Sequence, residues 1–153
     1  MNLKVSYSEE NTWPNQDKWT DFFHPIVSQT LQSSKLPPET WVSVLLSSDN
    51  YIQNLNKIYR GKDKPTNVLS FPMDDDADNC LGDIVLAFET IDREAKEANV
   101  LFEAHVAHMM VHGVLHLLGF DHETDKEAEE METLECRIMN QLGYDAPYPE
   151  WVN

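Results

Sequence analysis

Five of the six histidines of this sequence gather between residues 105 and 122, and their spacing suits a metal ion. In an α-helix of 3.6 residues per turn, His112 and His116 lie one turn apart on one face, so two imidazole nitrogens can reach the same ion. Gly119 then interrupts the helix, and the chain can turn back so that His122 approaches the same point. We therefore predict that His112, His116 and His122 ligate one metal ion. Zinc is the first candidate, and histidine nitrogens also accept Ni²⁺.

Three protein ligands leave one position of a tetrahedral zinc ion to solvent, which is typical of catalytic sites, whereas structural sites are closed by four protein groups. Zinc lowers the pKa of its water to about 7 and polarises a carbonyl or phosphoryl oxygen, so the pattern indicates a hydrolase. Cys136 as a fourth ligand would make the site structural. His105, His108 and Asp121 are candidates for supporting positions behind the ligands. His24 lies apart from the cluster and is interpreted as an ordinary residue.

The histidine spacing is that of the HExxHxxGxxH zinc proteases, with one difference. Residue 113 is Gly, where such proteases carry the Glu that acts as general base. Without that base, peptide hydrolysis loses a rate contribution of roughly 10² to 10⁴. The motif therefore supports zinc more strongly than it supports a protease. A zinc peptidase that takes its base from His108 or Asp121 stays open as an alternative.

A cluster of positive charge suits phosphodiester chemistry instead, and it consists of Lys57, Arg60, Lys62 and Lys64. Cleavage of a phosphodiester needs positive charge near the nonbridging oxygens, and the guanidinium of Arg60 can grip a phosphate through two hydrogen bonds. A solvated loop with scattered charges explains the same residues equally well.

The composition limits the class of protein. The chain of 153 residues suits a single domain, 1–153, and its formal net charge of -16 disfavours DNA, RNA and anionic membranes except at a local cationic patch. The start lacks the pattern of a signal peptide, and no apolar run approaches the ~20 residues of a membrane span. We expect a cytoplasmic protein without membrane association.

Periodicity predicts the elements that position these side chains. Alternating or Val-rich patterns predict strands at residues 3–7, 40–48, 67–71 and 82–88. Helical patterns predict helices at residues 17–33, 49–61 with Asp49 as N-cap, 91–99, 101–118 and 125–142. Thr124 and Glu127 form a capping box before the last helix. The polar run 73–79 is predicted to be a loop.

The segment HMMVHGVLHLLGFDHETDKEAEEME, residues 108–132, resembles the YbeY family of bacterial endoribonucleases, whose signature is HGxLHLxGYDH. Phe120 stands where the family usually has Tyr. The blocks LNKIYRGKDKPTNVLSFP, residues 55–72, and LGDIVL, residues 81–86, are similar to the family as well. The first fifty residues match only in the general order of elements.

The resemblance implies an α+β fold, with a small central mixed β-sheet of about four strands, about five helices and a metal site at the base of a cleft. It also implies a zinc-dependent endoribonuclease specific for single-stranded RNA, which acts in ribosomal RNA processing, at the 3′ end of 16S rRNA, and in ribosome quality control. By motif match, Arg60 takes the place of the family's functional arginine. His112, His116 and His122 take those of its metal ligands, and His108 falls on a recurrent histidine.

The resulting hypothesis is that His112 and Arg60 act at a scissile phosphate of RNA, with Lys57, Lys62 and Lys64 on the rim of the cleft. The expected partners are RNA and the small ribosomal subunit with its assembly factors, and not DNA or membranes. A non-catalytic ribosome-assembly factor with a structural metal is a second alternative, beside the zinc peptidase.

Overall fold

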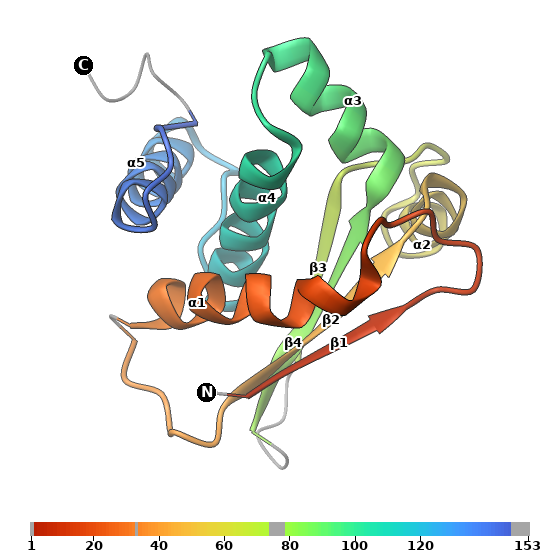
Figure 1. Cartoon of the computed structure of the whole chain (residues 1–153). Coiled ribbons are helices and arrows are strands. Elements are labelled where there is room, and N and C mark those ends of the chain that lie inside the picture. The colour runs from red at the N-terminus through yellow and green to blue at the C-terminus, as the bar shows by residue number, and fades with distance from the viewer. Residues whose placement is uncertain (1, 33, 74–78, 148–153) are drawn as a thin grey trace.

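The structure is a computed structural model that describes residues 2–32, 34–73 and 79–147, and it shows one mixed sheet with five α-helices (Figure 1). The strands are β1 (Asn2–Tyr7), β2 (Trp41–Ser47), β3 (Val68–Pro72) and β4 (Cys80–Ala87). The helices are α1 (Trp19–Leu31), α2 (Asp49–Arg60), α3 (Phe88–Ala98), α4 (Phe102–Leu117) and α5 (Asp125–Gln141). The predicted α+β fold class is confirmed.

The strand order is β1-β2-β4-β3, in which β1, β2 and β4 are parallel and β3 is antiparallel to β4, so β3 is an edge strand. The Ala87 N–H donates to the Asn67 carbonyl at 3.0 Å, next to the start of β3. Because alternate residues of an antiparallel strand direct their backbone groups to opposite edges, Val68 and Ser70 direct theirs away from β4. The edge strand therefore presents main-chain polar groups on its open side.

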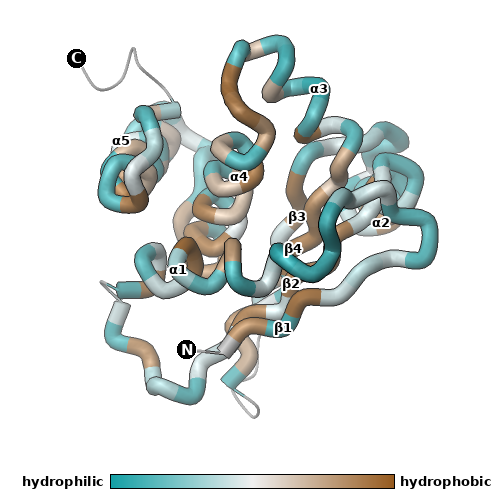
Figure 2. The backbone as a smooth tube through the Cα atoms, in the orientation of Figure 1, coloured by the Kyte–Doolittle hydropathy of each residue, from teal (hydrophilic) through white to brown (hydrophobic). Residues whose placement is uncertain are grey.

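The two faces of the sheet carry different helices. Alternate residues of β2 and β4, such as Val44 and Ile84, pack in the larger apolar cluster with α1, α3, α4 and α5. The residues between them, such as Val85, pack with Ile52 of α2 on the opposite face. Hydrophobic residues gather where α4 and the strands meet, whereas most of α3 is hydrophilic (Figure 2). Helix α4, which carries the histidine cluster, is thus buried on most sides, as its sequence predicts.

The start of α2 corrects one predicted cap. Ser48, and not Asp49, is the N-cap, because its hydroxyl accepts a hydrogen bond from the Tyr51 N–H at 3.3 Å. Asp49 is the first helical residue, and its carboxylate instead accepts hydrogen bonds from the backbone N–H and the hydroxyl of Thr90, at 3.0 and 2.7 Å. That contact also explains why α3 begins at Phe88, three residues before the predicted start.

The remaining boundaries differ little from the prediction. The helix predicted at 17–33 divides into a short 3-10 turn, Gln16–Lys18, and α1. Thr124 is the N-cap of α5, as predicted, and its hydroxyl accepts a hydrogen bond from the Glu127 N–H at 3.1 Å. Most of the predicted loop 73–79 lies outside the described residues.

Among the described residues, no single helix is long and apolar enough to span a membrane. Helices α3 and α4 reach that length and hydropathy only as a pair, which is bent by 116°.

Candidate metal centre

The three predicted ligands meet at the C-terminal end of α4. His112 and His116 occupy successive turns, and their Nε2 atoms are 3.0 Å apart. His122 comes from the loop after the helix, and the ligand atoms of the three rings all lie within 4.8 Å of one another. Two nitrogens bound tetrahedrally to zinc at about 2.0–2.1 Å are separated by roughly 3.3 Å, so this donor set fits a zinc ion.

A glycine turn returns His122 to the helix. The Gly119 N–H donates to the His116 carbonyl at 3.0 Å, and Gly119 has a φ of 102°. A side chain with a Cβ rarely adopts this φ, so glycine permits the reversal at this position. The Asp121 carboxylate then accepts a hydrogen bond from the His122 N–H at 2.8 Å. The predicted helix–glycine–histidine arrangement is present.

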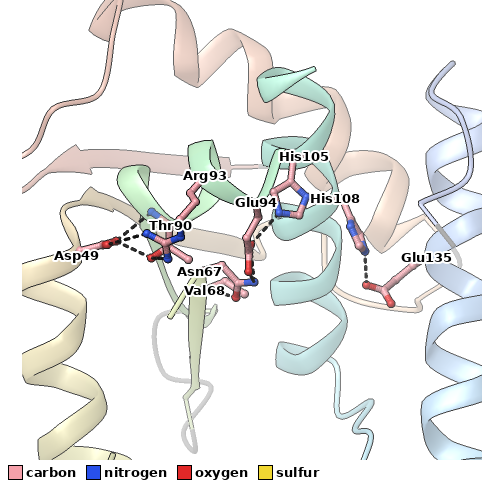
Figure 3. A network of polar contacts seen from close by, with 9 residues as sticks. All are labelled: Asp49, Asn67, Val68, Thr90, Arg93, Glu94, His105, His108 and Glu135. Carbon is pink, nitrogen blue, oxygen red and sulfur yellow. Dashed lines mark hydrogen bonds and ion pairs between the residues drawn. The ribbon is translucent and has the colours of Figure 1, made fainter. Parts of the chain in front are cut away.

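Glu135 of α5 supports the ligands, although the sequence pattern did not single it out as a site residue. Its side chain is 1% exposed, and its Oε1 lies 2.9 Å from His112 Nδ1 and 3.0 Å from His108 Nε2, the second contact being drawn in Figure 3. An ionised carboxylate only accepts hydrogen bonds, so both imidazoles donate here, and in the neutral form of His112 this leaves Nε2 as the nitrogen for a metal. The available signal was a carboxylate on the apolar stripe of α5, between Met131 and Ile138.

The protonation states of these groups also suit a metal site. Burial lowers the pKa of His116 to about 4, and His112 and His122 act in the same direction, so His116 is neutral at pH 7. Burial by itself raises the pKa of Glu135, but hydrogen bonds from His108 and His112 and their charge lower that pKa to about 2. Metal binding requires deprotonated ligands, and His116 is in that state at neutral pH.

The histidines open into a cleft of about 760 Å³. One wall is residues 66–72, including all of the edge strand β3, and the other is the end of α4 with residues 119–122. Tyr59 and Arg60, from the last turn of α2, complete the lining. The Ser70 hydroxyl donates to the Gly113 carbonyl at 3.0 Å and so fastens one wall to the other.

Comparison with known proteins agrees with this geometry. The family described as Endoribonuclease YbeY matches residues 4–143. The chain belongs to the YbeY family. Endoribonuclease YbeY of Rhizobium etli is 51% identical over an alignment of 162 positions, which covers 97% of this chain and 93% of that protein. Its counterpart in a Bradyrhizobium species is 44% identical over 147 residues, covering 90% and 87%. The solution structure of TM1509 from Thermotoga maritima matches with a TM-score of 0.64 and 25% identity, covering 98% of this chain and 91% of that one.

Of the four clustered cations in this YbeY-family chain, Arg60 alone lines the cleft. Arg60 is exposed, and its side chain makes no hydrogen bond or ion pair within the three ranges that the structure describes. Lys57, Lys62 and Lys64 are exposed but do not line the cavity, and Lys57 Nζ lies 3.9 Å from a carboxylate oxygen of Asp63. The structure thus brings Arg60 together with the histidines, while substrate binding by the lysines stays a prediction.

His105 belongs to a second polar network, outside the metal site. Its Nε2 lies 2.9 Å from Glu94 Oε1, and both Glu94 oxygens accept hydrogen bonds from the Asn67 side chain, at 3.0 and 3.2 Å (Figure 3). Asn67 Oδ1 in turn accepts a hydrogen bond from the Val68 N–H at 2.7 Å. The network therefore ties the first residues of the β3 wall to α3 and α4.

The other residues considered from the sequence lie as follows. Asp121 lines the cleft, with its carboxylate on the backbone of His122 rather than on a ligand ring. Cys136 is buried in α5 and is not part of the converging group of ligand atoms. His24 is an exposed residue of α1.

Gly113 lies where α4 packs closely against the sheet. A Cβ at this position would lie 3.1 and 3.2 Å from two side-chain carbons of Ile84 and 3.2 Å from Ser70 Oγ. The position of the protease glutamate thus points into the contact with the sheet. Sterics as well as sequence therefore argue against peptide hydrolysis by the usual route.

Proposed function

We propose that this YbeY-family chain is a zinc-dependent endoribonuclease that cleaves single-stranded RNA. The observation that carries the proposal is that three convergent imidazoles and an exposed guanidinium, from Arg60, line one cleft. The relatives named Endoribonuclease YbeY support RNA as the substrate.

His112, His116 and His122 would hold the ion. When bound, zinc polarises the phosphoryl group and lowers the pKa of an attacking water. Glu135 keeps the Nδ1–H of His112 engaged and so directs its Nε2 into the cleft. His108 donates to the same carboxylate and thereby limits its rotation.

Arg60 would bind a nonbridging oxygen of the scissile phosphate. Its side chain is not engaged by any residue that the structure describes, so the guanidinium is available for two parallel hydrogen bonds to one phosphate. As negative charge develops on those oxygens during cleavage, a positioned cation stabilises the transition state more than the ground state.

The edge strand would supply one neutral donor along the same wall. Val68 and Ser70 direct their backbone groups to the open side of β3, and the Val68 N–H is already bonded to Asn67. The Ser70 N–H thus faces the cleft as a donor for a phosphate or ribose oxygen. One strand edge suits one RNA backbone, whose bases can splay outward, and this favours a single-stranded substrate.

Lys57, Lys62 and Lys64 would act at longer range, outside the cleft. The net charge of -16 repels RNA as a whole, but at 0.1 M salt screening limits the range of each charge's electrostatic interaction to about 10 Å. The cluster of cations beside Arg60 therefore sets the local field that an incoming strand meets.

The family resemblance carries the biological assignment. We propose that the chain acts in the cytoplasm on ribosomal RNA, at the 3′ end of 16S rRNA and in ribosome quality control. Its partners would be the small ribosomal subunit and assembly factors.

The test compares the cleavage of single-stranded RNA, duplex RNA and DNA oligonucleotides by purified wild type and variants. The metal content of the untagged proteins is analysed alongside. Arg60→Ala is expected to lower kcat by roughly 10² to 10³. His112→Ala is expected to lose both bound metal and cleavage. Lys96→Ala removes an exposed cation of α3 that does not line the cleft, and it should cleave like wild type. Equal cleavage by all four proteins would reveal a contaminating nuclease and reject the proposal.

The two alternatives predict different results in the same preparation. A zinc peptidase would show chelator-sensitive cleavage of a peptide library and leave RNA intact. A non-catalytic assembly factor would lose folding and RNA binding together on metal removal, and the metal-loaded protein would turn over no substrate.

A further inference from the structure

We infer that Tyr59 is a stacking platform for an RNA base close to the scissile phosphate, and that the RNA strand leaves the metal cleft over the Tyr59 ring. The inference rests on the proposed function and adds to it a base-binding position outside the metal centre. Tyr59 immediately precedes Arg60 in the last turn of α2 and lines the same cleft. A phosphate held by Arg60 thus places the adjoining nucleotide beside the tyrosine.

The ring of Tyr59 is both exposed and held in place. Tyr59 is 66% exposed, although it makes an edge-to-face contact with Phe71 of β3, at a centroid distance of 5.2 Å and an interplanar angle of 63°. Phe71 itself packs against the apolar cluster under α2, so the pair is anchored in the fold. Whichever ring offers its edge, at least one face of Tyr59 is left open to a planar ligand.

Tyr59 and Phe71 also connect the cleft to a second cavity. They line both the metal cleft and a cavity of about 440 Å³ on the face of the sheet beside α2. The floor of this cavity includes Ser6 and Ser43, and Asp83 lies opposite Phe71 in the β3–β4 register. An RNA strand that extends past the Tyr59 ring therefore enters this second cavity, which continues the cleft.

The chemistry of the second cavity suits a base better than a phosphate. Its lining holds the Asp83 carboxylate and two serine hydroxyls, and none of the described residues that line it is Lys or Arg. A carboxylate repels phosphate but accepts a hydrogen bond from the exocyclic amino group of cytosine or adenine. Stacking on Tyr59 needs no particular base, because every base has a π-face. The cavity therefore fits an unstacked nucleobase next to the aromatic pair.

A single exposed apolar side chain is common and needs no function, and Ile58 is one such side chain. Ile58 is the neighbouring residue of α2 and is 72% exposed, but it lines neither cavity. It provides a matched control, since Ile58→Ala removes a similarly exposed side chain from the same helical turn.

The experiment measures KM and kcat for cleavage of a short single-stranded RNA by the metal-loaded protein. Tyr59→Leu keeps an apolar contact for Phe71 but has no π-face, and KM should rise about 5- to 150-fold, which corresponds to the roughly 1 to 3 kcal/mol of one stacked base. Tyr59→Trp should retain the wild-type KM, and Ile58→Ala should leave both constants unchanged. An unchanged KM in Tyr59→Leu would overturn the inference.

Substrates with one abasic nucleotide distinguish stacking from a structural effect. Removal of the stacked base should raise the KM of wild type, and on that substrate Tyr59→Leu should add nothing further. A penalty for Tyr59→Leu that is the same on every abasic substrate would also overturn the inference.

Failure of the proposed function is separately visible. If wild type binds fluorescein-labelled RNA without cleaving it, the endonuclease proposal fails, while anisotropy titrations still test Tyr59. The same 5- to 150-fold change is then expected in Kd, by about the same stacking energy.

Discussion

Glu135→Gln tests whether the buried carboxylate supports the metal site. The side chain is 1% exposed and accepts hydrogen bonds from His108 and His112 at 3.0 and 2.9 Å. Glutamine keeps the shape and an acceptor oxygen but loses the charge, and charge-assisted hydrogen bonds are roughly twice as strong as neutral ones. With about 1.5–3 kcal/mol for each bond to a charged group, the two bonds together lose roughly 1.5–3 kcal/mol.

For a partner behind a metal ligand, the usual cost of such a change is a fall in metal affinity of about 10- to 100-fold, and we expect that fall in zinc affinity here. Zinc affinity is measured by competition with a chromophoric chelator at pH 7, beside the melting temperature of the metal-free protein. Glu130→Gln, on an exposed position of α5, is the control and should bind zinc like wild type. If Glu135→Gln matched the control in zinc affinity, the supporting role of Glu135 would be refuted.

Three further predictions concern the rest of the site. Gly113→Glu should destabilise the metal-free protein by about 3 kcal/mol or more in urea unfolding, because it forces a charged side chain against Ile84, and it should not create peptidase activity. Burial raises the pKa of Glu94, but hydrogen bonds from His105 and the Asn67 amide leave it lowered. The free energy of unfolding of wild type should therefore fall relative to that of Glu94→Gln as the pH drops below about 4.5, and the difference between the two proteins should stay constant above that pH. A difference that stays constant from pH 6 to 3 would contradict this. Zinc at 100 times its Kd should stabilise wild type by about 2.7 kcal/mol and His112→Ala far less, as followed by thermal unfolding.

The metal ligands and most of the elements were predictable because they depend on local geometry. Two imidazoles four residues apart on a helix, followed by a glycine turn, meet wherever that helix is placed, so His112, His116 and His122 could be read from spacing. Each strand and each helix buries one face, so apolar residues alternate along the strands and form stripes on the helices. This periodicity can be read from the sequence.

The surroundings of the ligands depended on contacts between distant segments. Glu135 is 23 residues from His112, and only the packing of α5 on α4 turns an acidic residue of a helix into a partner of that ligand. In the same way, Asp49 resembles an N-cap in sequence, but its carboxylate is taken by Thr90 of another helix, and Ser48 caps α2.

The cleft shows the same division most clearly. Arg60, Lys57, Lys62 and Lys64 lie close together in the linear sequence, yet Arg60 alone of the four lines the cavity. Position along the chain brings like charges near one another, whereas the direction of each side chain is set by where α2 ends against β3. Residue types and spacing thus determined which chemistry the chain can perform. Packing of the edge strand and α5 against α4, with the end of α2 beside the edge strand, decided which side chains can take part in it, because burial and direction are properties of the folded surface.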